Sequence, residues 1–229
     1  MSQEPEPVSL PKRIPLFPLP NVVHLPHSLL PLTVFEPRYV RMVEDARRGD
    51  GIIGMVRLLP GWEESPEVEP RVARIGCAGR MTELKELPDR RFSLKLAGLH
   101  RFEIVSENHS RPYRVARIRP LPDRNEHARG EASNAALSRL LSLLDRLARD
   151  RGEGAFHDTG LPPSVPFAAA IHNLALLARL DPEDLQGLLE LSDIYARGRR
   201  VERILIGRLQ AQKRMEQWRG LTPKDPQSN

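Results

Sequence analysis

Residues 14–35 form an apolar stretch that carries no formal charge and is interrupted by five prolines, at positions 15, 18, 20, 26 and 31. Each proline fixes φ and removes a backbone donor, so a bilayer-spanning helix here would leave carbonyl groups without partners in hydrocarbon. We therefore expect this stretch to be buried inside a protein fold and not to span a membrane.

A helix is predicted directly after the apolar stretch. In the run Phe35-Glu36-Pro37-Arg38-Tyr39, Pro37 stands where a first helical residue is expected, and Gly49 is a natural C-terminal stop. The chain should therefore change from extended to helical conformation at this run.

Short strands are predicted between residues 51 and 120. Polar and apolar residues alternate over 91–96 and again over 113–118, and glycines at 76, 79 and 98 are typical of bent strands. The pattern indicates an α+β fold in which one early helix accompanies a small, bent and partly closed β-barrel.

The chain changes character after Pro122. Leucines at 137, 140, 141, 144 and 147 form one helical stripe, and further helices are predicted from Phe167, from Asp181 and from about Ser192 to Trp218. These helices cannot each bury a stripe alone, so we expect a bundle. We predict a disordered tail over 1–13, the barrel over 14–122, the helical bundle over 123–220 and a disordered tail over 221–229.

Composition restricts the class of protein. The 229 residues are 40% hydrophobic and 28% charged, with a net charge of +5. Charges of both signs occur in both halves, unlike the basic block of a dedicated nucleic-acid binder. The single cysteine, Cys77, allows no internal disulfide, and the first 13 residues lack the pattern of a signal peptide. The cytoplasm is the expected compartment.

Short sequence blocks stand out in the first half of the chain: Pro15–Leu19, Leu30–Leu32, Phe35–Tyr39, Gly54, Ile75–Gly79, Leu96–Phe102 and Pro112–Ala116. In this order they resemble the N-terminal domain of Lon proteases, also called the Lon substrate-binding domain. The resemblance implies a PUA-like barrel without a cofactor. It also implies a domain that helps to recognise polypeptide substrates and supports assembly of the hexamer.

We expect no catalytic residue, cofactor site or metal site. A Walker A loop needs a Gly-Lys pair, which this sequence does not contain. His24 and His27 are close in sequence, but no cysteine or carboxylate stands near them before Glu36, and structural metal sites normally have four ligands. Cys77 lies among small and apolar residues, which favours a buried strand residue over a nucleophile.

Two surfaces are candidates for binding a partner. Leu58, Leu59 and Trp62 form an apolar patch before an acidic loop, where Trp62 either folds back over the barrel or anchors an apolar segment of another protein. Arg199, Arg200 and Arg203 belong to an arginine-rich last helix. That face is either solvated or contacts an anionic partner.

The leading hypothesis is a non-catalytic module that binds unfolded or tagged polypeptides or a partner protein. The alternative is a PUA-like RNA-binding protein that uses the arginine-rich last helix for phosphate contacts. A degenerate enzyme ranks third, since no nucleophile, base and orienting group can be assembled from the sequence. The partner, the oligomeric state and any cooperation with a separate Lon protease stay open.

Overall fold

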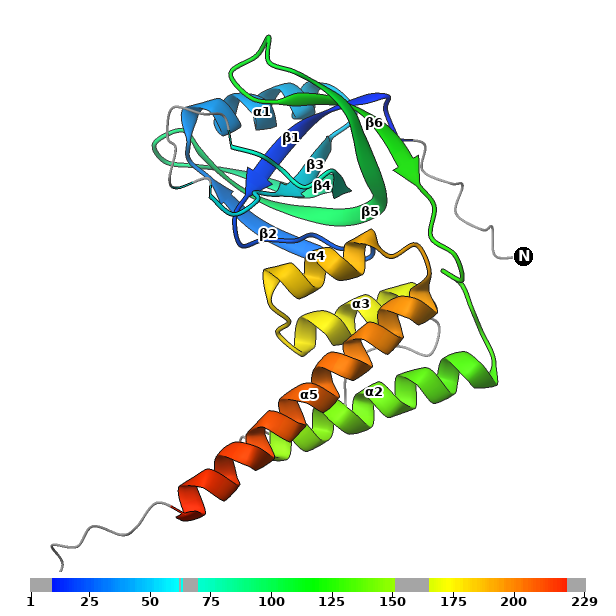
Figure 1. Ribbon diagram of the computed structural model, residues 1–229. Coiled ribbons are helices and arrows are strands. Elements are labelled where there is room, and N and C mark those ends of the chain that lie inside the picture. Colours follow the sequence, from blue (N-terminus) through cyan, green and yellow to red (C-terminus); the bar gives the residue numbers. More distant parts are fainter. Residues whose placement is uncertain (1–9, 62, 64–69, 151–164, 222–229) are drawn as a thin grey trace, which may run out of the picture.

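The computed structural model describes residues 10–61, 63, 70–150 and 165–221 (Figure 1). In chain order the first part contains β1 (Arg13–Leu19), β2 (Leu29–Val34), α1 (Pro37–Arg48), β3 (Ile52–Arg57), β4 (Ile75–Leu87), β5 (Arg91–Asn108) and β6 (Val115–Leu121). The second part contains α2 (Glu131–Asp150), α3 (Phe167–Leu177), α4 (Pro182–Glu190) and α5 (Ile194–Leu221). The predicted α+β class, with one early helix and a later group of helices, is confirmed.

The six strands form one sheet that closes on itself. Their order is β2-β5-β4-β3-β1-β6, and β5 also pairs with β6. The ring therefore comprises β1, β3, β4, β5 and β6, while β2 lies outside it against the first half of β5. β5 takes part in both pairings because it is 18 residues long and its register with β6 shifts between Ile104 and Ser106. Such shifts bend a strand and help a small sheet to close.

The interior of the ring is filled by side chains from all five of its strands. These are Ile14, Leu16, Ile52, Val56, Ala78, Phe102, Ile104, Ala116 and Ile118. Gly54 lies tightly against this interior, because a Cβ there would come within 2.7 Å of Ile14 and 2.9 Å of Phe102. The barrel thus has a packed core and no lumen at this level.

Helix α1 covers a second face of the strands. Its Pro37 occupies a first-turn position, and its buried residues Tyr39, Val40, Met42, Val43 and Ala46 recur at helical spacing. They pack against residues that alternate with the barrel-interior positions, such as Phe17 on β1 and Met55 on β3. The β1 part of the proline-rich opening is therefore buried between the barrel interior and α1. Other parts of residues 14–35 are exposed, with Leu29 and Phe35 at 55% and 66%, so the expected burial holds only in part.

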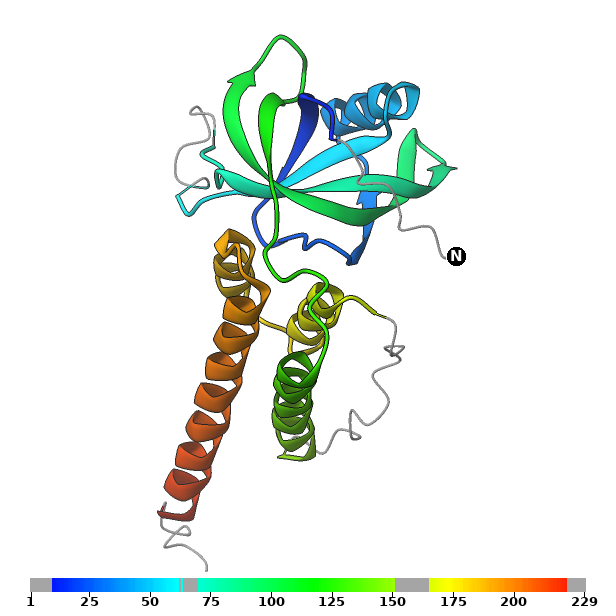
Figure 2. The ribbon, with the colours of Figure 1, turned by 90° about the vertical axis from the view of Figure 1, so that its right-hand side faces the viewer.

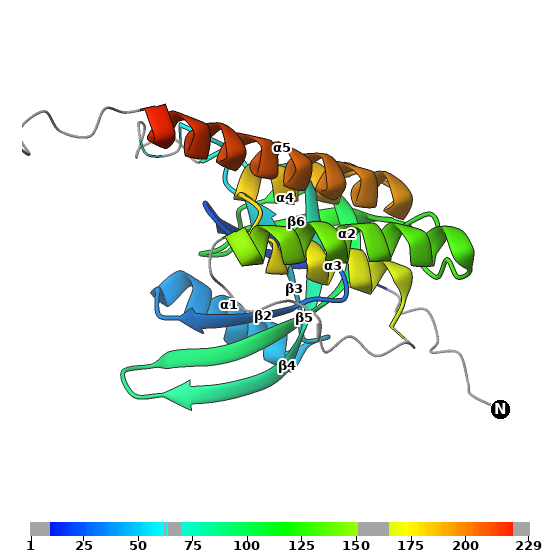
Figure 3. The same ribbon diagram turned by 90° about the horizontal axis from the view of Figure 1, so that it is seen from below.

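The helices α2 to α5 lie across one end of the barrel (Figure 3). Their core includes Leu140, Leu144 and Leu147 of α2, and it extends to Val23, Leu25 and Cys77 of the barrel part. Figure 2 shows α5 running beside α2 and then past its end. None of the described helices is both long and apolar enough to cross a membrane.

Candidate functional site

The structure places the predicted apolar patch at the edge of a groove. Leu58 is half-buried just after β3, and its backbone N–H donates to Leu19 O at 3.0 Å. It lines a cavity of about 690 Å³. Leu59 is half-buried and donates its N–H to Arg71 O at 2.9 Å, but it does not line this cavity. Trp62 lies outside the described residues.

The cavity, here named the motif groove, joins segments that are distant in sequence. Its lining comprises Pro18, Leu19, Pro20, Glu36, Arg38, Tyr39, Leu58, Glu63, Pro70, His109, Arg111, Pro112, Tyr113 and Arg114. The residues 36–39 and 112–114 belong to two of the sequence blocks that stand out in the first half of the chain. The fold therefore brings both blocks to one concave surface, which mixes apolar and proline surface with charged side chains.

Tyr39 is held rigidly in the groove. Its ring packs on Phe17 with centroids 4.5 Å apart, and the Arg38 guanidinium carbon lies 4.6 Å from its ring centroid. Arg38 also pairs with Glu36 at 2.9 Å. Burial raises the pKa of Tyr39, so its hydroxyl stays neutral over the physiological range. Tyr39 is only 6% exposed, so its ring belongs mainly to the core beneath the groove.

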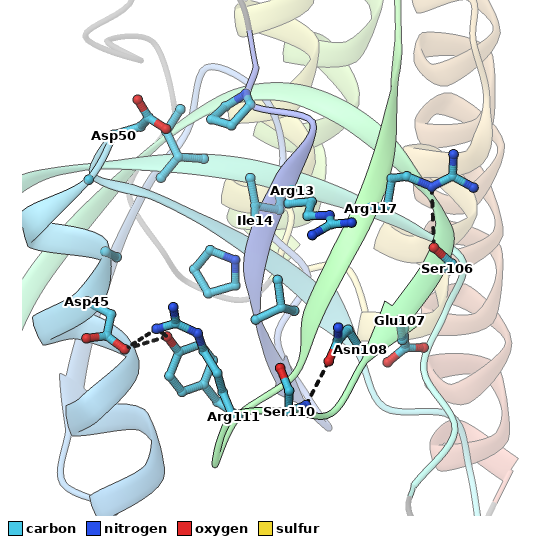
Figure 4. Close-up of a pocket in the computed structure, with 17 residues that line it drawn as sticks. Arg13, Ile14, Asp45, Asp50, Ser106, Glu107, Asn108, Ser110, Arg111 and Arg117 are labelled. Carbon is cyan, nitrogen blue, oxygen red and sulfur yellow. Dashed lines mark hydrogen bonds and ion pairs between the residues drawn. The ribbon is translucent and has the colours of Figure 1, made fainter.

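Two residues that line the groove, Arg111 and Tyr113, are held in place by Asp45, which does not line it. Asp45 accepts from the Tyr113 hydroxyl at 2.7 Å and from Arg111 Nη1 at 2.6 Å (Figure 4). Burial acts to raise the pKa of Asp45, but the bond from Tyr113 and the charges of Arg41 and Arg111 bring it below its ordinary value. Asp45 is therefore ionised at neutral pH and ties the β5–β6 connection to the end of α1.

A second polar cluster lies between the barrel and the helices. Asp123, in the connection after β6, accepts from Arg101 Nε at 2.5 Å and from Arg197 Nη1 and Nη2 at 2.8 and 2.6 Å. Arg101 comes from β5 and Arg197 from α5, and they are 2% and 0% exposed. One carboxylate thus joins two buried guanidinium groups from the two parts of the chain.

The cluster is completed by backbone carbonyls and a histidine. Arg101 also donates to Leu189 O at 3.0 Å, and Arg197 donates to Leu188 O at 3.0 Å. The ring of His172 lies 2.8 Å from Pro26 O through Nδ1 and 2.7 Å from Arg197 Nη1 through Nε2. Burial and the Arg197 charge lower the pKa of His172 to about 3. A neutral ring with the proton on Nδ1 satisfies both contacts, so this cluster is a fixed structural joint.

The basic residues of α5 have different environments. Arg197, also on this arginine-rich helix, is fully buried, so it is neither solvated nor free to contact a partner. Arg200 pairs with Asp184 at 3.5 Å, and Arg208 donates to Ala178 O at 2.6 Å beyond the end of α3. Arg199 and Arg203 are exposed. Contact of Arg199, Arg200 and Arg203 with an anionic partner stays a prediction.

The groups considered for chemistry lie in packed environments. Cys77 is fully buried, and burial strongly raises the pKa of its thiol. His24 is 3% exposed, and burial lowers its pKa to about 4. In the parts of the chain that the structure describes, no three His, Cys, Asp or Glu side chains gather as metal ligands would.

Comparison with known proteins places this geometry in a family. Residues 13–206 match the family described as the ATP-dependent protease La (LON) substrate-binding domain. The chain belongs to the Lon substrate-binding domain family. The match covers both the barrel and most of the helical part, and it includes every sequence block on which the resemblance rests.

Lon proteases are among the relatives of this Lon substrate-binding domain. It is 29% identical over 200 residues to "Lon protease 2" of Myxococcus xanthus, covering 86% of this chain and 24% of that protein. It is 31% identical over 203 residues to "Lon protease 2" of Sorangium cellulosum, again covering 24% of the relative. The chain thus spans about a quarter of the length of these curated relatives.

Solved structures share the fold. A Lon N-terminal domain protein from Xanthomonas campestris is 25% identical, with a TM-score of 0.59 over 85% of this chain and 97% of that one. The N-terminal domain of Mycobacterium avium complex Lon protease has a TM-score of 0.61 at 15% identity, covering 86% and 97%. The Lon substrate-binding domain fold therefore extends over both the barrel and the helices of this chain.

Sequence reasoning missed the buried joint. Arg101, Asp123, His172 and Arg197 are far apart in sequence, and of these only Arg101 belongs to one of the sequence blocks. One signal was present, because Arg197 lies three residues after Ile194 and four before Val201, two buried positions of α5. That spacing puts Arg197 on the buried stripe of the helix.

Proposed function

We propose that this chain is a non-catalytic recognition module that binds polypeptide segments in the motif groove. Membership of the Lon substrate-binding domain family supports recognition of polypeptide substrates. The observation that carries the assignment to this groove is its lining, which unites residues 36–39 with residues 112–114. The expected compartment is the cytoplasm.

The groove has the size and surface that a short segment of another chain requires. Its volume of about 690 Å³ is within the range of specific ligand sites, which is roughly 300–1,000 Å³. Leu19 and Leu58, both half-buried, supply apolar surface for side chains. Arg38 lies at the same surface, where its guanidinium group can donate to peptide carbonyl groups. An extended segment with apolar side chains fits both requirements.

Binding of this kind needs no reaction centre. The Cys77 thiol is buried with a raised pKa, and the pKa values of His24 and His172 are lowered far enough to keep both rings neutral. A nucleophile requires an accessible, activated group, and a general base requires a pKa near the working pH. These three side chains therefore have a packing role.

Fluorescence anisotropy with a labelled, unstructured peptide rich in Leu, Tyr and Pro tests this function. We expect binding to the wild-type chain and a loss of at least tenfold in affinity for Leu58→Asp, since a carboxylate would enter an apolar contact. Leu176→Asp is the matched control, because Leu176 is a partly exposed leucine of α3 outside the groove. Equal affinities for the three proteins, or no binding to the wild type, would contradict the proposal.

A further inference from the structure

A second cavity adjoins the motif groove on the other side of Arg111 and Tyr113, which line both. This cavity, here named the arginine cavity, has a volume of about 560 Å³ and lies between the start of β1, the end of α1 and the β5–β6 connection (Figure 4). A polypeptide held in the motif groove could therefore reach it by passing one pair of side chains.

Two arginines stand side by side in the arginine cavity. Arg13 on β1 is directly opposite Arg117 on β6 in the antiparallel register, so both side chains project from the same face. Both are exposed. Like charges directly opposite each other destabilise a strand pair, so this arrangement has a cost in the folded protein. An anion between the two guanidinium groups would remove that cost.

The carboxylates that line the cavity do not neutralise this pair. Asp45 is bound to Arg111 and Tyr113, and Glu107 is paired with Arg114 at 3.0 Å. Asp50 lies at the opposite side of the cavity from both arginines (Figure 4). Within the described part of the chain, neither Arg13 nor Arg117 has a carboxylate oxygen within 4.0 Å. Arg117 Nε has a long contact of 3.4 Å to Ser106 Oγ.

We propose that the arginine cavity is an oxyanion-binding site whose charge partners are Arg13 and Arg117, and that the oxyanion is a carboxylate of the polypeptide bound in the motif groove. Guanidinium groups bind carboxylates through paired, charge-assisted hydrogen bonds. Arg111 and Tyr113 lie between the two cavities and line both. One ligand with an apolar part and an acidic part therefore fits the two cavities together. This assignment rests on the proposed function and narrows it to segments that carry an acidic side chain or a free C-terminus.

Two labelled peptides of the same apolar sequence test the assignment. One ends in two glutamates with a free carboxylate, and the other ends in two glutamines with an amide. We expect the acidic peptide to bind the wild-type chain about tenfold more tightly at low salt. Arg13→Gln with Arg117→Gln should abolish this preference and leave the affinity for the amidated peptide unchanged.

The control is Arg199→Gln with Arg203→Gln, which removes the same charge from exposed positions of α5. It should keep the preference. Two results would overturn the oxyanion site while leaving the proposed function intact. One is equal affinity of the two peptides for the wild-type chain, and the other is an equal loss of the preference for the acidic peptide in both double variants. No binding of either peptide would overturn both.

Inorganic phosphate distinguishes a peptide carboxylate from a free anion. We expect phosphate at millimolar concentration to weaken binding of the acidic peptide and not of the amidated one. Phosphate could instead shift the nuclear magnetic resonance signals of Arg13 and Arg117 while the chain shows no preference for the acidic peptide. That result would assign the cavity to a small anion and overturn the proposal that it binds a peptide carboxylate. The melting temperature of the Arg13→Gln, Arg117→Gln variant should equal or exceed that of the wild type, since a repulsive pair is removed.

Discussion

Replacing Asp123 by asparagine should be among the most destabilising single changes in this chain. The carboxylate makes three contacts of 2.5 to 2.8 Å with Arg101 and Arg197, and its side chain is 6% exposed. Asparagine has nearly the same shape but no charge, and its amide group presents donors to guanidinium donors. The change would leave two buried positive charges close together without a counterion.

The magnitude follows from the burial of both arginines. Removing one partner of a buried ion pair typically costs about 3–5 kcal/mol, because the remaining charge stays desolvated. The carbonyls of Leu188 and Leu189 continue to accept from the arginines, which limits the loss to that range. Since domains of this kind are stable by about 5–15 kcal/mol, such a loss would consume a large share of the total.

Urea unfolding followed by circular dichroism measures this loss directly. The matched control is Glu83→Gln, which removes an exposed ion pair with Lys95 at 3.0 Å and should cost less than about 1 kcal/mol. Hydrogen exchange should show reduced protection of α3 to α5 relative to the barrel in Asp123→Asn, since the joint lies between them. If Asp123→Asn lowered the free energy of unfolding no more than Glu83→Gln does, the joint would not stabilise the fold as described.

Two further predictions follow from buried groups. His24 and His172 have folded pKa values of about 4 and about 3, below the unfolded value of 6.5, so the unfolded chain binds protons first as the pH falls. The free energy of unfolding should therefore drop by about 2 kcal/mol per histidine between pH 7 and pH 5, and a flat urea midpoint over that range would contradict this. Gly98→Ala would put a Cβ 2.2 Å from Leu25 O and should cost about 1–3 kcal/mol, whereas Gly207→Ala meets no atom within 4 Å and should stabilise α5 by about 0.5–1 kcal/mol. Thermal unfolding of the two variants should shift in opposite directions.

Much of the fold could be predicted because its determinants are local. The prolines of residues 14–35 exclude a long helix, Pro37 marks the start of α1, and leucine spacing predicts α2. Alternation identifies the first half of β5, where Phe92, Leu94 and Leu96 are buried. These features depend on neighbouring residues, so one sequence is sufficient to recognise them.

The joint could not be predicted because burial there depends on packing between the two parts. Arg101 stands at a position that alternates with the barrel-interior residues Phe102 and Ile104, and so belongs to the outer face of β5. Only the helices across that face exclude water from it. The sequence does not indicate which part of the outer face they cover.

The motif groove was predicted only in part for a similar reason. Leu58 was identified as a partner-binding residue from its local apolar patch, whereas Tyr39 and Pro112 were identified only as parts of sequence blocks. Sheet closure and the packing of α1 bring these three residues to one cavity. These residues can be recognised in the sequence, but their arrangement depends on long-range strand pairing.

The most direct test of the central claim is a nuclear magnetic resonance titration of the isotope-labelled chain with the apolar peptide. The largest shifts should fall on Tyr39, Leu58 and Tyr113, with Leu176 of α3 unaffected. Shifts concentrated on the helices, or none at concentrations where anisotropy detects binding, would contradict recognition of polypeptides in the motif groove.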